Sequence, residues 1–178
     1  MKETFTIRDV KIFLMSESDL EEVHEIERRI YPQPWSLGIF RGELGKPDKR
    51  VYMVARLHNK IVGYAGLMIT DSEGHITNLA VDMPYRERKI GTLLALRLVE
   101  MAILKGLHWL ALEVRESNDI AQRLYTKFSF HPVGVRKGYY SDGENALIMW
   151  TDDIASPEYR RAIQKIKKEL LSDADSGD

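Results

Sequence analysis

The sequence of 178 residues contains no cysteine, which excludes disulfide bonds, a thiol nucleophile and cysteine-ligated zinc. Five histidines remain as possible metal ligands, but they are scattered along the chain without metal-ligand spacing, and we expect no metal site. The absence of cysteine also fits the reducing cytoplasm, which is the location we expect. The histidines are His24, His58, His75, His108 and His131.

The sequence also lacks a long hydrophobic run and an excess of charge of either sign. Its most apolar stretch, residues 93–114, is interrupted by Arg97, Glu100 and Lys105, so it does not predict a membrane span. The first ten residues contain no apolar run of the kind found in signal peptides. Because the formal net charge is −1, we expect no general attraction to nucleic acid or to a membrane surface.

The patterns that are present predict one α/β domain with a single sheet and helices on both of its faces. Helical spacing of apolar residues, with capping residues before it, predicts helices at residues 20–31, 36–44, 90–104, 118–128 and from 157 onward. Strand patterns occupy residues 10–15, 50–57, 61–70, 76–81, 109–114, 133–139 and 146–150. We expect residues 1–153 to form the domain, 154–171 a helical extension and 172–178 a disordered acidic tail.

The turn between the strand at 76–81 and the helix at 90–104 is a candidate anion site. It is basic and contains Gly91, and it leads directly into a helix whose first N–H groups have no partner within the helix. A phosphate there would be surrounded by the N–H groups of residues 88–92, with Arg86 and Arg88 supplying charge. Many strand-to-helix turns of this composition bind nothing, so the pattern leaves both interpretations open.

Glu113 is the candidate general base. It is a carboxylate in an apolar run near the carboxyl end of a buried strand, where open α/β sheets place their ligands. Partial burial favours the protonated form of a carboxyl group and brings it closer to the range of a base that works at neutral pH. The alternative is that Glu113 pairs with Arg115 or points outward at the end of the strand. No Gly-x-Ser-x-Gly nucleophile motif is present.

Four aromatic residues are candidates for the site. Tyr125 lies on the apolar face of the helix that follows the strand of Glu113; it is either a core residue or an acid whose hydroxyl serves a neighbour. Trp35, Tyr139 and Tyr140 lie in loops beside proline or glycine. Loops at one end of a sheet can form a groove for an extended peptide, and they can equally be minor packing.

Taken together, these segments resemble the GNAT acetyltransferases, and among them the RimI-type N-terminal protein acetyltransferases. The similarity extends over about residues 10–153, and its most specific part is Leu-Glu-Val-Arg-x-Ser-Asn followed by Ala-x-x-Leu-Tyr. The resemblance implies a mixed, mostly antiparallel sheet of about seven strands, with acetyl-CoA as the donor and no metal. The matching segments are residues 78–82, 85–94, 112–118 and 121–125, with Phe128 and Phe130.

The resemblance also implies roles for individual residues. Glu113 matches the general base and Tyr125 the general acid of the RimI type. Segments that contain Trp35, Tyr139 and Tyr140 line the peptide groove in that family. The acceptor would be the N-terminus of a protein or peptide, with a ribosomal protein as a candidate, and the enzyme a monomer or weak dimer. Acetyl-CoA would be held by Leu79, Ala80, Val81, Arg86, Glu87, Arg88, Lys89, Ile90, Gly91, Thr92 and Asn118.

One position departs from the family pattern, Gln/Arg-x-x-Gly-x-Gly/Ala. Lys89 stands where a glycine allows the backbone to approach phosphate closely. We expect weaker but real binding of acetyl-CoA. Two other classes of function remain open at this point: a GNAT enzyme acting on a lysine side chain or a small amine, and a non-catalytic module that binds acyl-CoA or a partner.

Overall fold

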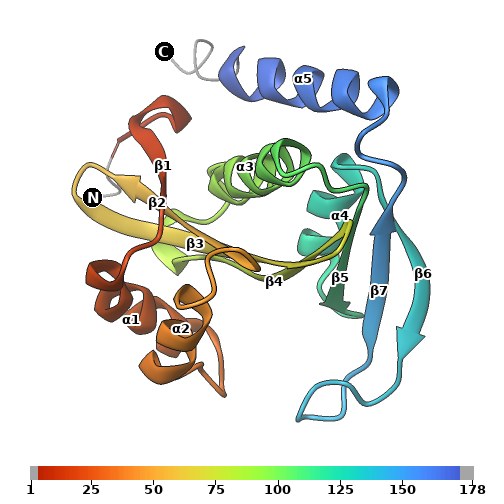
Figure 1. Ribbon diagram of the computed structural model, residues 1–178. Helices are drawn as coiled ribbons and strands as arrows, with labels where there is room; N and C mark the ends of the chain where they lie inside the picture. Colours follow the sequence, from red (N-terminus) through yellow and green to blue (C-terminus); the bar gives the residue numbers. More distant parts are fainter. Residues whose placement is uncertain (1–3, 173–178) are drawn as a thin grey trace.

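A seven-stranded sheet with the order β1-β2-β3-β4-β5-β7-β6 forms the centre of the computed structural model, which describes residues 4–172 (Figure 1). Only β4 and β5 run parallel, and every other pair of neighbours is antiparallel. This confirms the expected mixed, mostly antiparallel sheet. The strands are β1 (Val10–Leu14), β2 (Arg50–Leu57), β3 (Lys60–Thr70), β4 (Glu73–Val81), β5 (Trp109–Arg115), β6 (Phe130–Arg136) and β7 (Ala146–Thr151).

Helices cover the two faces of the sheet unequally (Figure 1). On one face, α1 and α2 pack on β2, β3 and β4 through a cluster that includes Phe40, Tyr52 and Tyr64. On the other, α3, α4 and α5 share the main core with the sheet. The helices are α1 (Leu20–Ile30), α2 (Leu37–Leu44), α3 (Ile90–Leu104), α4 (Asp119–Lys127) and α5 (Pro157–Ser172), with short 3-10 turns at Ile7–Asp9, Glu17–Asp19 and Met83–Tyr85.

The helix α3 is the centre of the main core, as its composition predicts. Eight of its residues are buried, because it lies between the sheet and α5 and meets apolar side chains on most sides. The helix α5 begins at Pro157, as predicted, and the Ser156 hydroxyl caps it by accepting a hydrogen bond from the Tyr159 N–H at 3.2 Å. It places Tyr159, Ile163 and Leu170 against the core.

The predicted bounds of two strands were wrong. The strand β4 begins at Glu73 and not at residue 76, because Glu73 and Gly74 already pair with Thr70 and Ile69 of β3. The strand β6 is Phe130–Arg136 and not 133–139, because Phe130 and His131 already pair with Thr151 and Trp150 of β7. The strand contains Pro132, although proline cannot donate a ladder hydrogen bond. It is tolerated because β6 is the edge strand and has a bulge between Pro132 and Gly134.

The tail expected at 172–178 lies, beyond Ser172, outside the described residues; Ser172 itself is the last residue of α5. In the described part of the chain, no helix is long and apolar enough to cross a membrane.

The feature that positions the site is the separation of β4 from β5. The two strands pair only where residues 73–75 face residues 109–111. Beyond His75, β4 stays paired with β3 as far as Val81, while β5 stays paired with β7 as far as Arg115. The edge of β4 that faces β5 therefore carries backbone N–H and C=O groups with no ladder partner on that side.

Candidate active site

Glu113 lies on β5 just beyond the last residue that pairs with β4. Its side chain is 8% exposed and contacts two cations or potential cations: Oε2 is 2.6 Å from His75 Nε2, and Oε1 is 3.5 Å from Arg136 Nη2. Alternation along β5 puts Leu112 and Val114 into the main core, so Glu113 faces the side of the sheet that carries α1 and α2. A nearly buried carboxylate thus stands at the separation of the two strands.

The alternative that Glu113 pairs with Arg115 is wrong. Arg115 Nη1 instead contacts Asp142 Oδ2 at 2.8 Å and Glu144 Oε2 at 2.6 Å, both in the β6–β7 loop. Hydrogen bonds from the Ser117 hydroxyl and N–H, followed by that from Arg115, hold the pKa of the Glu144 carboxyl at about 2. The ion pairs tie the loop to β5 at neutral pH.

This tied loop positions the predicted tyrosine pair. The Arg115 guanidinium lies 3.9 Å from the centre of the Tyr140 ring, and the rings of Tyr139 and Tyr140 meet edge to face at 5.1 Å. Tyr139 is also within 5.6 Å of the Arg136 guanidinium. The hairpin therefore presents one aromatic ring beside Arg136, which contacts Glu113, and a second ring under Arg115.

Tyr125 is the buried phenol of the site. It is 7% exposed, and its ring packs 5.6 Å from that of Phe130. Its hydroxyl makes no hydrogen bond with any described residue, yet every fully buried side-chain polar atom among residues 4–172 has a partner. The hydroxyl must therefore open into accessible space. Burial raises the pKa of Tyr125, and the nearby Tyr31 and Tyr140 raise it further, so the phenol keeps its proton at neutral pH.

Tyr31 is a member of this cluster that the sequence analysis missed. It follows the last residue of α1 and is 36% exposed overall, while desolvation of its hydroxyl, aided by Glu27, raises its pKa to about 12. Tyr31 and Tyr140 also influence each other electrostatically, as each does Tyr125. The three phenols, from the residue after α1, from α4 and from the β6–β7 hairpin, are therefore near enough to affect one another's pKa. The sequence signal that could have identified Tyr31 is its position before Pro32, at the start of the loop that contains Trp35.

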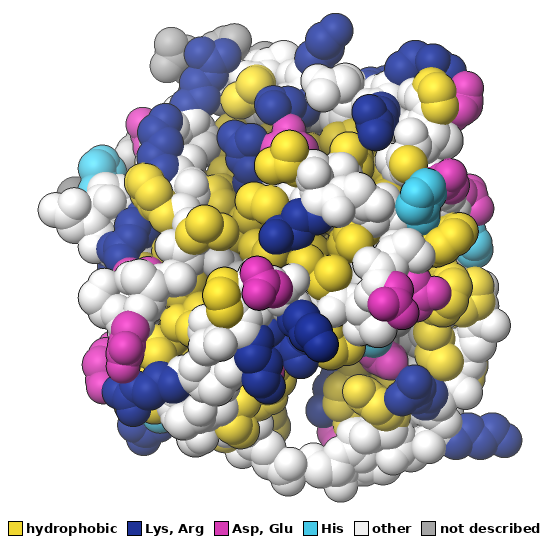
Figure 2. Space-filling view, viewed as in Figure 1, with side chains coloured by type: hydrophobic (Ala, Val, Ile, Leu, Met, Phe, Trp, Pro, Cys, Tyr) yellow, Lys and Arg dark blue, Asp and Glu magenta, His cyan; other side chains and the backbone are white. Residues whose placement is uncertain are grey.

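Trp35 is placed by Glu27, a buried carboxylate of α1. The backbone N–H of Trp35 donates to Glu27 Oε1 at 3.0 Å, and the Tyr64 hydroxyl donates to Glu27 Oε2. The indole packs 5.5 Å from the Phe40 ring. Trp35 packs against the core cluster under α1 and α2 and so fixes the α1–α2 loop. The surface is hollowed between that side of the molecule and the β6–β7 hairpin (Figure 2).

The predicted anion turn has an unusual backbone. Glu87 and Lys89 both have φ of 63°, in the left-handed region that L-residues rarely adopt. Arg86 Nε donates to the Val81 carbonyl at 3.1 Å, which ties the turn to the end of β4. The Arg88 guanidinium is directed away, donating to the Phe5 carbonyl at 3.1 Å and stacking 3.5 Å from the Phe5 ring. Arg86, and not Arg88, therefore remains the candidate charge of the turn.

The start of α3 suits a diphosphate. Its first intrahelical bond runs from the Leu93 N–H to the Lys89 carbonyl at 3.0 Å, so the N–H groups of residues 90–92 precede the helical ladder. A Cβ added at Gly91 would point at Leu124, Leu79 and Val81, at 3.6 to 3.8 Å. Glycine therefore keeps open the space between α3, α4 and β4. The Asn118 Oδ1 caps α4 by accepting from the Ala121 N–H at 3.1 Å, which leaves its Nδ2 as a donor.

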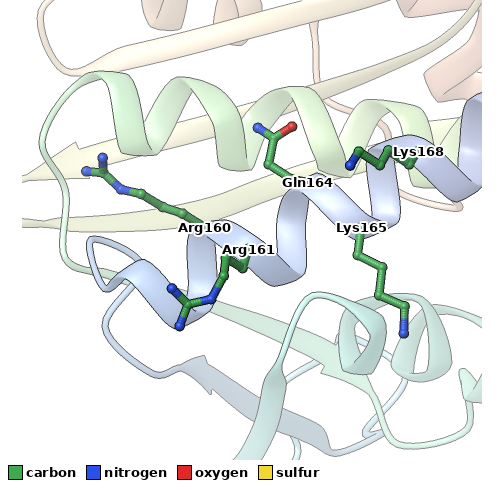
Figure 3. Close-up of a pocket in the computed structure, with 5 residues that line it drawn as sticks. All are labelled: Arg160, Arg161, Gln164, Lys165 and Lys168. Carbon is green, nitrogen blue, oxygen red and sulfur yellow. The ribbon is translucent and has the colours of Figure 1, made fainter.

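A cavity of about 390 Å³ lies elsewhere, on the surface of α5 (Figure 3). All its lining residues belong to that helix, and it is separate from Glu113 and Tyr125. We assign it no part in the site. Among residues 4–172, no cluster of acidic residues and histidines could hold a metal ion. The cavity is lined by Arg160, Arg161, Gln164, Lys165 and Lys168.

Comparisons with known proteins identify the family of this chain. The model of the acetyltransferase (GNAT) family matches residues 20–130. A Bacillus subtilis protein, provisionally named a ribosomal protein bS18-alanine N-acetyltransferase, is 38% identical over 151 residues, which are 84% of this chain and 97% of the relative.

Two solved structures show the same fold. The ribosomal-protein-S18-alanine N-acetyltransferase of Escherichia coli superposes with a TM-score of 0.75 at 29% identity, covering 81% of this chain and 94% of that one. An N-acetyltransferase of Thermoplasma acidophilum, solved in complex with coenzyme A, gives 0.68 at 20% identity, covering 80% of this chain and 98% of that one.

Proposed function

This chain belongs to the GNAT acetyltransferase family, as a RimI-type, acetyl-CoA-dependent N-acyltransferase, and from that premise we propose that it acetylates the N-terminal α-amine of a protein. The acceptor named for the relatives, ribosomal protein S18, makes a ribosomal protein the first acceptor to test. A cytoplasmic location and a monomeric or weakly dimeric state belong to the same proposal.

The observation that supports the proposal is a pair of groups with the chemistry of a base and an acid: Glu113 is a nearly buried carboxylate just beyond the point where β4 and β5 stop pairing, and Tyr125 is a buried phenol that keeps its proton at neutral pH. Glu113 can accept a proton and Tyr125 can donate one, and these are the two transfers that N-acetylation by a thioester requires. A site that only bound a ligand would need neither.

Acetyl-CoA supplies the activated acetyl group, and the residues of this chain do the rest. An α-amine has a pKa near 8, so most of it is protonated at pH 7 and must lose a proton before it can attack. Glu113 takes that proton, directly or through one water. As the nitrogen–carbon bond forms and the carbon–sulfur bond breaks, Tyr125 gives its proton to the leaving sulfur. Holding the two reactants in line contributes several kcal/mol more.

The donor would lie along the unpaired edge of β4. Backbone groups of Leu79, Ala80 and Val81 would pair with the pantetheine arm, to which Asn118 Nδ2 could also donate. The turn of Arg86, Glu87, Arg88, Lys89, Ile90, Gly91 and Thr92 would hold the diphosphate through backbone N–H groups.

The acceptor would enter from the opposite side, through the hollow between the α1–α2 loop and the β6–β7 hairpin. Tyr139 is 48% exposed there, and Tyr31 and Tyr140 have hydroxyls with no hydrogen-bond partner among the described residues, so all three can contact a peptide. Trp35 contributes by fixing the α1–α2 loop.

We expect peptides with a free α-amine to release CoA thiol in the presence of acetyl-CoA and this enzyme. Peptides that carry lysine but are blocked at the N-terminus should release no CoA thiol above background, because they lack the free α-amine that we propose as the acceptor. A thiol-reactive dye measures the release. Reaction of the blocked peptides would indicate a lysine acetyltransferase, and no release from either panel would indicate a module that does not catalyse transfer.

We expect Lys89→Gly to tighten the binding of acetyl-CoA, by up to about tenfold. Glycine adopts a φ of 63° without strain and lets the backbone approach the diphosphate closely, so the turn is better organised for binding. Calorimetric titration measures the affinity. Asp71→Gly is the matched control, because Asp71 also has positive φ, at 51°, but lies in the β3–β4 turn at the opposite end of β4. Unchanged affinity in Lys89→Gly would contradict the prediction.

A further inference from the structure

His75 occupies a defined position at the separation of the strands. It is the last residue of β4 that pairs with β5, opposite Ala111, and Glu113 is two residues beyond Ala111 on the same face. The diagonal contact between His75 Nε2 and Glu113 Oε2 is 2.6 Å, the distance of a close ion pair when the imidazole is protonated. Because a carboxylate only accepts, the imidazole nitrogen is the group that can supply a proton to this contact.

We propose that His75 is a positioning residue for acetyl transfer: its contact with Oε2 holds the Glu113 carboxylate so that the other oxygen, Oε1, faces the acceptor amine. The proposal rests on the proposed role of Glu113 as the base. Arg136, the second group on Glu113, contacts Oε1 from 3.5 Å with a side chain that is 56% exposed. Such an exposed contact is weak, so an incoming amine can replace it at Oε1.

The other charged groups nearby do not offer Glu113 a comparable donor. Arg115 is held by Asp142 and Glu144, and Tyr140 lies under the Arg115 guanidinium. His75 is therefore the residue that orients the base. Its side chain is 31% exposed against 8% for Glu113, so it can be changed with less disturbance to packing than the carboxylate itself.

Two substitutions at His75 separate orientation from packing. In His75→Ala the donor is lost, and we expect kcat to fall about tenfold to a hundredfold, as misplacement of a catalytic group does, with KM for both substrates within about twofold of wild type. In His75→Gln an amide N–H replaces the imidazole N–H at similar reach, and we expect kcat to return to within about threefold of wild type. Steady-state kinetics on a free-amine peptide give both constants.

His108→Ala is the matched control. The His108 Nδ1 pairs with Asp153 Oδ1 at 3.0 Å, so this histidine also contacts a carboxylate, but it precedes β5 at the end remote from Glu113. We expect its kcat to equal that of wild type. Thermal unfolding and calorimetric binding of CoA confirm that each variant is folded and binds the donor.

A double-mutant cycle shows whether His75 acts through Glu113. In the Glu113→Gln background we expect His75→Ala to lower kcat by less than about twofold, because the group it positions is already absent. An equal fall in both backgrounds, a wild-type rate in His75→Ala, or a His75→Gln variant as slow as His75→Ala would overturn the role of His75. Wild-type activity in Glu113→Gln alone would instead overturn the proposed base, so the two failures are distinguishable.

Discussion

Glu113→Gln is expected to lower kcat at pH 7 by about two to four orders of magnitude, the contribution of a well-placed general base. Glutamine keeps the shape of the side chain and can keep the contact with His75 Nε2, which lies 2.6 Å from the carboxylate oxygen in the native protein. It cannot take a proton from the amine. The fold and the affinity for CoA should therefore be close to those of wild type.

The pH dependence of this variant gives a second signature. Above the α-amine pKa of about 8, most of the acceptor is already deprotonated and needs no base. The deficit of Glu113→Gln should therefore shrink as the pH rises from 7 to 9.5. Steady-state rates across this range measure it, with Glu73→Gln as control, since Glu73 is an exposed carboxylate of β4 outside the site. A wild-type rate at pH 7 would remove Glu113 from the mechanism.

Tyr125→Phe is expected to lower kcat by about tenfold to a hundredfold. The effect should be smaller than that of Glu113→Gln because a thiolate, whose thiol has a pKa near 8.5, is a good leaving group even when no acid protonates it. Burial raises the pKa of Tyr125, so the acid form persists as the pH rises and is lost only above the ordinary range of tyrosine. The wild-type rate should accordingly show no alkaline fall below about pH 10 from this group.

Tyr159 provides the matched control for Tyr125. It is also buried, and burial also raises its pKa, but its hydroxyl donates to the Phe128 carbonyl at 2.8 Å. Tyr159→Phe should cost about 1 kcal/mol of the free energy of unfolding and leave kcat unchanged. Tyr125→Phe should show the opposite pattern, because its hydroxyl has no partner among the described residues. Equal rates in the two variants would exclude Tyr125 as the acid.

The sequence was a good guide where local pattern decides structure. Apolar residues on most sides of residues 90–104 predict a buried helix, and α3 has that burial. The departure from the family pattern at Lys89 was visible in the sequence. The φ of 63° at this residue explains why the family pattern has glycine there, since glycine adopts this conformation without strain. The edge strand β6 was misplaced because proline normally argues against a strand, and the pattern could not reveal which strand lies at the edge.

The partners of Glu113 could not be predicted for a different reason. His75 and Glu113 are 38 positions apart in the sequence, and they meet only because of the parallel register in which His75 faces Ala111. Arg136 reaches the same carboxylate from β6, across β7. Arg115, which is near in sequence, points instead to the β6–β7 loop. Contacts set by register between strands distant in sequence have no signature in a single chain.

The central claim is that the acceptor is an N-terminal α-amine delivered to Glu113. Its most direct test is the position of the acetyl group on a peptide that has both a free α-amine and an internal lysine, located by tandem mass spectrometry after reaction with acetyl-CoA. We predict acetylation at the α-amine and an unmodified lysine. Acetyl groups on the lysine, with the N-terminus left free, would contradict the account.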